Sequence, residues 1–282
     1  MQSPKLTLAA ICPLSASVVM ADKMAADTTS AEDLKLYRDY FTKRFPGVPL
    51  NEFGNGVYAI DKVSRDSWEA IEEFPPYEPM IEAGETMWNT PFANGQSYGS
   101  CFGGEPAQRK NFPYWDAKRK MVVTLPLAIN ECRERNGEKP LKYKKGAIAD
   151  LLAYMSYESR GQKINVTVPD DPDAVKAYND GKNFYFARRG QLNFSCAQCH
   201  MESASMHVRT DTLSPALGHT SGWPVYRSKW GELGTLHRRF GGCNKQVRAK
   251  DFKAQGEEYR NLEYFLSHMS NGIEYNGPSS RK

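Results

Sequence analysis

Apolar side chains recur at helical spacing in two long stretches of the chain. In "AEDLKLYRDYFTKRF", residues 31–45, leucine and aromatic side chains fall three or four positions apart. The same period runs through "GEEYRNLEYFLSHMS", residues 256–270. This spacing predicts amphipathic helices that each bury one face. Glycine and proline are frequent between such stretches, which indicates loops. The pattern therefore predicts a mainly α-helical fold with long irregular loops.

The first 21 residues have the pattern of an export signal. Lys5 precedes the largely apolar run "LTLAAICPLSASVVM", and Val19 and Ala21 are small residues of the kind that a signal peptidase reads. A buried first helix is the alternative, but Pro13 in the middle of the run and the polar residues after it count against it. We expect a signal peptide over residues 1–21 and export from the cytoplasm. No other run reaches the roughly 18 apolar residues of a membrane span, so we expect none in the mature chain.

Composition adds two constraints. The 282 residues carry a formal net charge of only +4, with no basic stripe interleaved with aromatic residues, which argues against nucleic acid as a partner. The mild positive charge suits anionic small molecules or an acidic partner. Six cysteines are present, and five remain once Cys12 leaves with the signal. An odd number in an exported protein indicates one thiol with a special use.

The strongest motif is C-x-x-C-H, formed by Cys196, Cys199 and His200. Two thiols at this spacing can add to the two vinyl groups of a haem, and the adjacent histidine then binds the iron as an axial ligand. A redox C-x-x-C would be expected within a βαβ pattern, which the flanking residues do not show. Half of a zinc site would need a second Cys/His pair at suitable spacing, and the sequence offers none. The motif therefore predicts one covalently bound haem c.

The second axial ligand is open at this point. Met269 is the ordinary candidate, because electron-transfer cytochromes c use a distal methionine well downstream of the motif. It sits, however, in the helical apolar pattern of residues 256–270, which favours a core position. Cys243 is the other candidate. It lies in "LHRRFGGCNKQVRAK", where neighbouring cations favour a thiolate.

The chain also contains an internal repeat. "GQSYGSC" ends at Cys101 and "GQLNFSC" ends at Cys196, and the similar stretches "LLAYMS" and "NLEYFLS" follow Cys132 and Cys243 at nearly equal distances. Repeats of this kind mark duplicated units. We expect two tandem cytochrome-c-like domains, over residues 50–165 and 166–282, preceded by an N-terminal extension over residues 22–49.

The register of the repeat predicts a lost haem site. Where the second unit has Cys199 and His200, the first has Gly104 and Glu105, so the first domain should bind no haem. Its two remaining cysteines, Cys101 and Cys132, can form a disulfide. Closing a loop of about 30 residues in this way stabilises the folded state by a few kcal/mol in the chain-entropy model. Two separate free thiols are the alternative.

Cys243 is then the single cysteine without a partner. In the same register it corresponds to Cys132 of the first unit, which places it on the distal side of the haem bound by Cys196 and Cys199. The repeat thus favours Cys243 as the second axial ligand.

These residues resemble a known family. C-x-x-C-H followed by "RRFGGCNKQVRAK" and "EEYRNLEYFLSHMSNG" resembles SoxA, the larger haem subunit of the SoxAX cytochromes of bacterial thiosulfate oxidation. The resemblance covers nearly the whole mature chain, including "NTPFANGQSYGSC". Because Cys101 is not part of a C-x-x-C-H motif, the chain resembles the single-haem form of the family.

The resemblance implies an activity and site residues. Family members pair with the small cytochrome SoxX in the periplasm and act as L-cysteine S-thiosulfotransferases. They join thiosulfate oxidatively to a cysteine of the carrier SoxYZ and pass two electrons to haem. Carried over residue by residue, Cys196 and Cys199 would hold the haem, and His200 and Cys243 would bind its iron. Cys243 would also carry the catalytic persulfide, and Arg239 would bind the substrate.

Other functions remain possible at the level of the sequence. A plain electron-transfer cytochrome with Met269 as the distal ligand is the main alternative, and a sensor with an exchangeable thiolate is another. The pattern also leaves open whether Arg238, Lys245 and Arg248 steer an anion or are ordinary surface charges.

Overall fold

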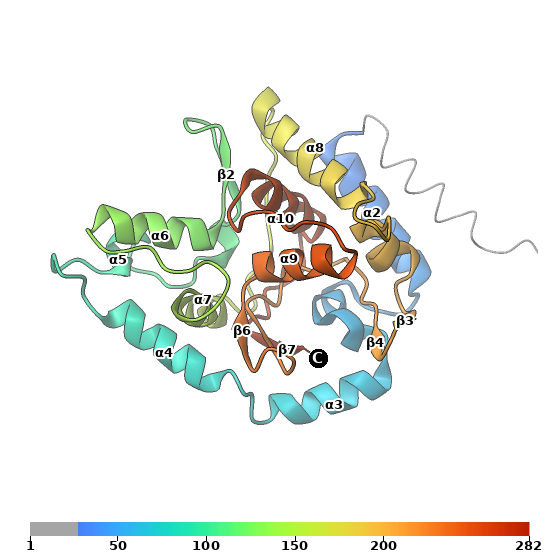
Figure 1. Cartoon of the computed structure of the whole chain (residues 1–282), viewed down its shortest axis with the longest axis horizontal. Coiled ribbons are helices and arrows are strands. Elements are labelled where there is room, and N and C mark those ends of the chain that lie inside the picture. Colours follow the sequence, from blue (N-terminus) through green and yellow to red (C-terminus); the bar gives the residue numbers. More distant parts are fainter. Residues whose placement is uncertain (1–27, 282) are drawn as a thin grey trace, which may run out of the picture.

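The computed structural model describes residues 28–281 (Figure 1). Helices make up most of its regular structure, so the prediction of a mainly helical fold is confirmed. The predicted export signal, residues 1–21, lies outside the described residues. Within residues 28–281, no helix has both the length and the apolar character needed to cross a bilayer. The α-helices are α2 (Ser30–Arg44), α3 (Lys62–Glu72), α4 (Glu78–Asn89), α5 (Tyr98–Cys101), α6 (Leu125–Arg135), α7 (Ala147–Glu158), α8 (Pro172–Phe186), α9 (Leu236–Gln246) and α10 (Glu257–Met269).

Shorter elements connect these helices. Two 3₁₀ segments, η1 (Leu50–Ala59) and η2 (Arg109–Asn111), and one π-helical turn, η3 (Gln198–Glu202), are present in the described part. The strands are β1 (Tyr114–Asp116), β2 (Met121–Val123), β3 (His207–Val208), β4 (Asp211–Thr212), β5 (Val225–Arg227), β6 (Glu232–Gly234) and β7 (Ser279–Arg281). They form two separate hairpins, β1–β2 and β3–β4, and one three-stranded sheet in the order β6–β5–β7.

Helix α2 is one of the helices that the hydrophobic period predicts. The Thr29 side chain accepts a hydrogen bond from the Glu32 backbone, and Glu32 accepts one from the Thr29 backbone, so a capping box begins the helix. Its apolar face buries Tyr37 and Phe41 in the same core as α8 and α10. A buried ion pair of 2.9 Å between Asp33 and Lys182 of α8 ties the two helices together.

Two crossed helix pairs organise the two halves of the chain. Helix α4 crosses α7 at Gly84, where an added Cβ would lie 2.1 Å from the carbonyl oxygen of Asp150. Helix α8 crosses α10 at Gly181, where an added Cβ would lie 2.0 Å from the carbonyl oxygen of Asn261. Each crossing therefore depends on a glycine that lets two backbones approach closely. The first pair belongs to one hydrophobic core and the second pair to another.

A hairpin followed by a helix also occurs in each half. The β1–β2 hairpin leads through Thr124 into α6, and the β5–β6 hairpin leads through Thr235 into α9. Each threonine hydroxyl accepts a hydrogen bond from the third residue of its helix and so caps it. Cys132 and Cys243 both occupy the eighth position of their helices. The two cysteines thus have the same place in two similar hairpin–helix segments.

The disulfide predicted from the sequence is confirmed. Cys101 at the end of α5 is joined to Cys132 of α6, with 5.9 Å between their Cα atoms. Cys132 is fully buried, and the core of the first half packs around it. The described residues contain three other cysteines, all free: Cys196, Cys199 and Cys243.

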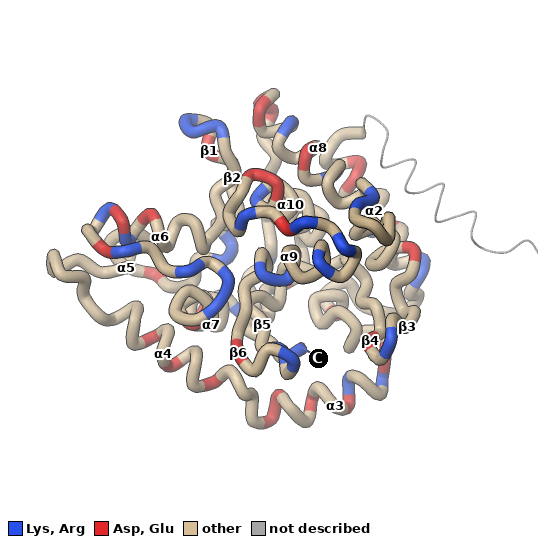
Figure 2. The backbone as a smooth tube through the Cα atoms, viewed as in Figure 1, with Lys and Arg blue, Asp and Glu red and all other residues tan. Residues whose placement is uncertain are grey.

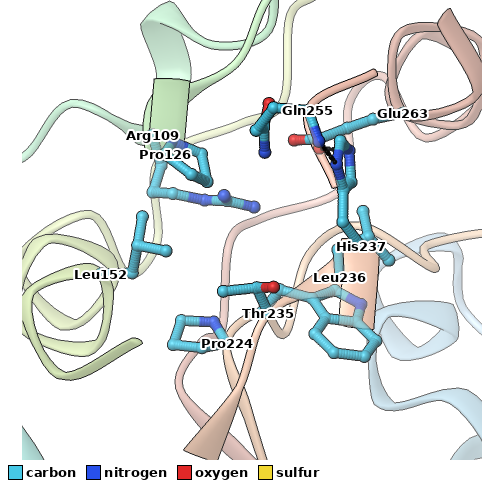
Figure 3. Close-up of a pocket in the computed structure, with 10 residues that line it drawn as sticks. Arg109, Pro126, Leu152, Pro224, Thr235, Leu236, His237, Gln255 and Glu263 are labelled. Atoms are coloured by element: carbon cyan, nitrogen blue, oxygen red, sulfur yellow. Dashed lines mark hydrogen bonds and ion pairs between the residues drawn. The ribbon is translucent and has the colours of Figure 1, made fainter. Parts of the chain in front are cut away.

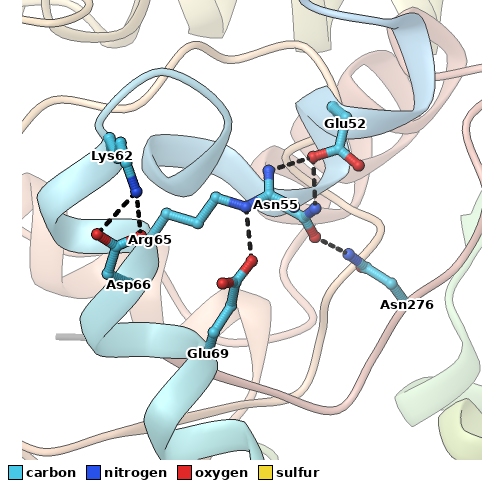
Figure 4. Close-up of polar contacts among 7 residues, drawn as sticks. All are labelled: Glu52, Asn55, Lys62, Arg65, Asp66, Glu69 and Asn276. Atoms are coloured by element: carbon cyan, nitrogen blue, oxygen red, sulfur yellow. Dashed lines mark hydrogen bonds and ion pairs between the residues drawn. The ribbon is translucent and has the colours of Figure 1, made fainter.

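The segment of η1 and α3 packs on the C-terminal half (Figure 4). Arg65 of α3 forms ion pairs with Glu52 at 2.6 Å and with Glu69 at 2.8 Å. Asn276 donates a hydrogen bond of 2.9 Å to Asn55, and the Ser280 backbone donates one of 2.8 Å to Glu72. In Figure 1, α3 and α4 accordingly form an outer arc around the central helix α9.

A small cavity of about 20 Å³ lies where the two halves meet (Figure 3). Arg109 and Leu152 of the first half face His237 and Glu263 of the second across it. The His237 ring accepts a hydrogen bond of 3.0 Å from the Gln255 backbone and lies 2.9 Å from the Glu263 carboxylate. This buried polar contact fixes the first turn of α9, the helix that carries Cys243.

Candidate functional site

One turn of chain carries both thiols of the C-x-x-C-H motif. The Ser195 hydroxyl accepts a hydrogen bond of 3.1 Å from the Gln198 backbone, and the Gln198 side chain accepts one of 3.1 Å from the Ser195 backbone. These reciprocal bonds hold Cys196 and Cys199 at the start of η3. Burial raises the pKa of Cys196 to about 12 and raises that of Cys199 as well, so both thiols stay protonated.

The His200 ring is oriented by a backbone carbonyl. Its Nδ1 lies 2.9 Å from the carbonyl oxygen of Ser214, and because a carbonyl can only accept, Nδ1 must carry the proton. Nε2 is then the nitrogen available to a metal, an arrangement that a hydrogen-bonded carbonyl commonly imposes on metal-binding histidines. The motif therefore presents a histidine in the tautomer that an axial ligand requires.

The sequence did not predict that His219 packs beside His200. Its ring packs edge-on against the His200 ring, with 4.5 Å between centroids, and its Nε2 lies 3.0 Å from the Ser214 hydroxyl. Burial lowers the pKa of His219 well below its ordinary value, and the positive charges of Arg239 and Arg281 lower it further. A neutral His219 thus supports one face of the His200 ring.

Cys243 of α9 lies within electrostatic reach of all three residues of the motif. Its thiol interacts electrostatically with the His200 side chain. Burial alone would raise the pKa of Cys243, but the positive charges of Arg239 and Arg227 and the contact with His200 outweigh it and lower the pKa to about 7. The fold therefore brings a readily ionised thiol to the histidine of the motif.

The predicted site residues thus lie together. Cys196, Cys199, His200, Arg239 and Cys243 share one electrostatic neighbourhood although they come from η3 and α9. Two protonated thiols on one turn, a histidine with a free Nε2 and a thiol facing it match the donor set of a c-type haem. The described residues contain no group of three or more His, Cys, Asp or Glu side chains placed to hold a bare metal ion. Met269 is fully buried in the core.

The cations around Cys243 differ in their partners. Arg238 stacks on the Trp230 ring at 4.1 Å and pairs with Glu232 at 3.1 Å, and Lys245 pairs with Asp251 at 3.4 Å. Arg248 is exposed to solvent. These three residues therefore have structural or surface positions.

Arg227 is a further residue near the thiol that the sequence did not nominate. It ends strand β5, and its guanidinium interacts electrostatically with Arg239 and Cys243. A signal was present in the repeat, because the two hairpins align Arg227 with Asp116 of the first half. The change from an acidic residue in one repeat to an arginine in the other could have pointed to position 227 as different in function.

Comparisons with known proteins identify the family. Residues 83–164 match the model of the SoxA/TsdA cytochrome c domain. The chain is 64% identical over 255 residues to the L-cysteine S-thiosulfotransferase subunit SoxA of Allochromatium vinosum, covering 90% of this chain and 91% of that protein. It is 57% identical over 250 residues to the same subunit of Chlorobaculum thiosulfatiphilum, covering 89% of this chain and 87% of that protein.

A solved structure agrees with these matches. The crystal structure of SoxXA from P. pantotrophus superposes with a TM-score of 0.69 and 30% sequence identity, covering 77% of this chain and 84% of that chain. High identity over almost the full length of named relatives, together with the shared fold, leaves one assignment. The chain belongs to the SoxA family.

Proposed function

We propose that this chain is the catalytic subunit of an L-cysteine S-thiosulfotransferase, which joins thiosulfate to a cysteine of a carrier protein. The relatives from A. vinosum and C. thiosulfatiphilum carry that activity in their names. The observation that carries the proposal is the Cys243 thiol, whose pKa is lowered to about 7 beside His200 and Arg239. A thiol poised in this way, with a guanidinium next to it, suits chemistry between sulfur atoms on an anionic substrate.

One haem c would be held by this site. Cys196 and Cys199 would form the thioether links, and His200 and Cys243 would bind the iron. The orientation of His200 by the Ser214 carbonyl and the position of Cys243 support this set. When bound, the haem supplies the electron acceptor that an oxidative conjugation needs.

The balance of the reaction defines what the side chains must do. A carrier thiol, RSH, and thiosulfate, S₂O₃²⁻, give RS–S–SO₃⁻, one proton and two electrons. The planar guanidinium of Arg239 would hold sulfonate oxygens of the dianion. The Cys243 sulfur, as a persulfide in the active form, would lie where the new sulfur–sulfur bond forms. The lowered pKa of the Cys243 thiol favours an anionic sulfur at this position, next to the positive charge of Arg239.

We also propose that the chain is a duplicated cytochrome c whose first unit has lost its haem. The cytochrome c domain model matches residues 83–164, a stretch without a C-x-x-C-H motif. The glycine crossings of α4 with α7 and of α8 with α10 support two units with cores over about residues 78–158 and 172–269. In the first unit, the disulfide between Cys101 and Cys132 would replace the haem as the covalent link between loop and helix.

Partners and location follow from the same assignment. The similar solved structure is named SoxXA, which supports a small SoxX cytochrome as the partner of this chain. SoxYZ would be the carrier and thiosulfate the substrate. An export signal over residues 1–21 would direct the chain to the periplasm.

The proposal is tested on the haem-loaded complex with SoxX. Cys243→Ala should abolish thiosulfate conjugation to SoxYZ, measured by mass spectrometry of the carrier cysteine, and should change the ferric absorption spectrum. Cys243→Ala with full conjugation would overturn the proposal. A ferric spectrum of methionine ligation in the wild-type complex would instead favour plain electron transfer, with Met269 as the ligand.

A further inference from the structure

The small cavity where the two halves meet is lined by buried polar side chains. Among them, Arg109 is 7% exposed, Gln255 7%, His237 1% and Glu263 5%. Figure 3 shows the Arg109 side chain extending from the first half towards the other three. Charged side chains more often lie at the surface, as they do along helices α3 and α8 in Figure 2. A buried arginine and a buried glutamate on one cavity therefore need hydrogen-bond partners there.

Three buried side-chain nitrogens of these lining residues have no hydrogen-bond partner among residues 28–281. One is Nε of Arg109, whose guanidinium donates a hydrogen bond of 2.8 Å to the Thr220 carbonyl oxygen through another nitrogen. A second is Nε2 of Gln255, whose side-chain oxygen accepts a hydrogen bond of 2.6 Å from the Thr124 hydroxyl. Unpaired donors in the interior cost free energy, so native proteins nearly always provide an acceptor for them.

The third nitrogen belongs to His237. Its Nδ1 accepts a hydrogen bond of 3.0 Å from the Gln255 backbone, so the ring carries its proton on Nε2. The Glu263 carboxylate lies 2.9 Å from Nε2, but the N–H does not point at it in the geometry of a hydrogen bond. The carboxylate can therefore accept from a further donor. The lining thus combines three N–H donors with one carboxylate acceptor.

The size and the charge of the cavity together indicate what fits it. One water molecule needs about 10–15 Å³ of cavity volume, and this cavity has about 20 Å³. A small anion would be attracted by Arg109 but repelled by Glu263. A water molecule can accept a hydrogen bond from the first and donate one to the second. The lining also offers the two to four polar partners that an ordered internal water requires.

We propose that this cavity is a water site, in which one buried water molecule accepts hydrogen bonds from Arg109 and Gln255 and donates one to Glu263. The water joins the first half of the chain to the second. Gln255 and Glu263 are also the polar neighbours of His237 in the first turn of α9, so the bridge fixes the helix that carries Cys243. Arg109 is therefore a positioning residue for α9. This positioning role, unlike the water site itself, rests on the proposed function.

The water site is tested by a crystal structure of the haem-loaded complex with SoxX. Density for one water molecule should lie within about 3 Å of Arg109 Nε, Gln255 Nε2 and the Glu263 carboxylate. A second crystal is soaked in bromide. An anomalous bromide peak at this position would mean that the site binds an anion, and the lack of any density there would mean that the cavity is dry. Either result would overturn the proposal.

A double-mutant cycle with Arg109→Met and Glu263→Met tests whether the water joins the two halves. Each single variant should lower the denaturant midpoint of the complex. In the Glu263→Met background, Arg109→Met should lower it by about half as much or less, because the shared bridge is already lost. Additive losses would overturn the bridge. Lys110→Met is the control, since it removes a charge from the exposed neighbour of Arg109 and should leave the midpoint unchanged. Should Arg109→Met not fold, Arg109→Gln replaces it in the same cycle.

The positioning role is measured by the rate of thiosulfate conjugation to SoxYZ and by the ferric haem spectrum. Arg109→Met should lower kcat about tenfold and change the spectrum, because a small displacement of a reacting group slows the chemistry. Arg109→Lys keeps the charge and an N–H donor for the water, so it should recover most of the rate, which a loss of packing alone would not allow. Lys110→Met should match the wild type. An unchanged kcat and spectrum in Arg109→Met would overturn the positioning role.

The failure of the proposed function has a different signature. If Cys243→Ala conjugates thiosulfate at the wild-type rate, the proposed function fails, and the positioning role fails with it. The density in the cavity and the denaturant midpoints require no activity, so they still decide whether the water site exists.

Discussion

Gly84 lies directly against the backbone of Asp150, since a Cβ on Gly84 would come within 2.1 Å of the Asp150 carbonyl oxygen. Contact this close between two helices leaves no room for any side chain, because the clash is with backbone that cannot rotate away. The crossing of α4 and α7 is therefore encoded by one residue, as the crossing of α8 and α10 is by Gly181.

Gly84→Ala should lower the free energy of unfolding by about 2 kcal/mol or more, since overpacking of a buried contact typically costs roughly 1–3 kcal/mol. Chemical denaturation of the purified chain measures this. Gly99→Ala is the control, because its nearest neighbour, the Ser97 hydroxyl, would lie 3.4 Å from the new Cβ. Equal stability of the two variants would mean that α4 can move away from α7.

Removing the disulfide should destabilise the first half. The bond joins two cysteines that are 31 positions apart in the sequence. For a loop of this length, the chain-entropy model gives a stabilisation of the folded state of about 3–4 kcal/mol. The double variant Cys101→Ser, Cys132→Ser should therefore unfold at lower denaturant, and reductant should lower the midpoint of the wild type but not that of the variant. If reductant also lowered the midpoint of the double variant, the loss of stability would have to come from other cysteines.

The buried ion pair between Asp33 and Lys182 should be sensitive to loss of one partner. Lys182→Met leaves the fully buried Asp33 carboxylate without its cation, which typically costs about 3–5 kcal/mol. Lys176→Met on the same helix is the control, because its pair with Asp180 is exposed and worth well under about 1 kcal/mol. The two variants are compared by their denaturant midpoints. A Lys182→Met chain as stable as the control would show that α2 is not anchored by this pair.

Asp150 should make stability depend on pH. Burial, with a smaller contribution from Glu232, raises the pKa of Asp150 to about 6 from its ordinary value of 3.8. The folded state therefore holds this proton more tightly than the unfolded state. The contribution of this proton to the free energy of unfolding is complete below about pH 4 and is lost as the pH rises through about 6.

Asp150→Asn has no proton to lose at this position. It should be more stable than the wild type at about pH 8, and the difference should shrink as the pH falls towards about 4. Calorimetric thermal midpoints across this range test it. The exposed residue Asp66 supplies the control, since Asp66→Asn should follow the wild-type curve. A stability difference between Asp150→Asn and wild type that does not change with pH would contradict the assignment.

Several features of the fold could be predicted from short or repeated patterns in the sequence. The C-x-x-C-H spacing lies within one turn, and the repeat aligned Cys101 and Cys132 with residues of the second unit, so the amino-acid sequence alone was enough to predict the disulfide. The helical period likewise predicted α2 and α10. These features depend on neighbours in sequence or on a duplicated pattern, which a single sequence contains.

Contacts between distant segments could not be predicted in this way. His219 reaches the His200 ring through the loop that contains Ser214, and no spacing rule predicts that packing. The placement of α3 on the C-terminal half depends on individual polar contacts such as the one between Asn55 and Asn276. Such contacts depend on which surfaces meet in the folded protein, and they do not follow a repeating pattern in the sequence.

The disulfide between Cys101 and Cys132 also bears on how the chain matures. Thiols that form thioether links to a haem, as proposed for Cys196 and Cys199, must stay reduced until the haem arrives, whereas Cys101 and Cys132 are oxidised. Early closure of Cys101 on Cys132 removes both from competition and leaves only Cys196, Cys199 and Cys243 reactive among the described residues. The first half can thus reach its final covalent state through this disulfide alone, which requires an oxidant and no cofactor.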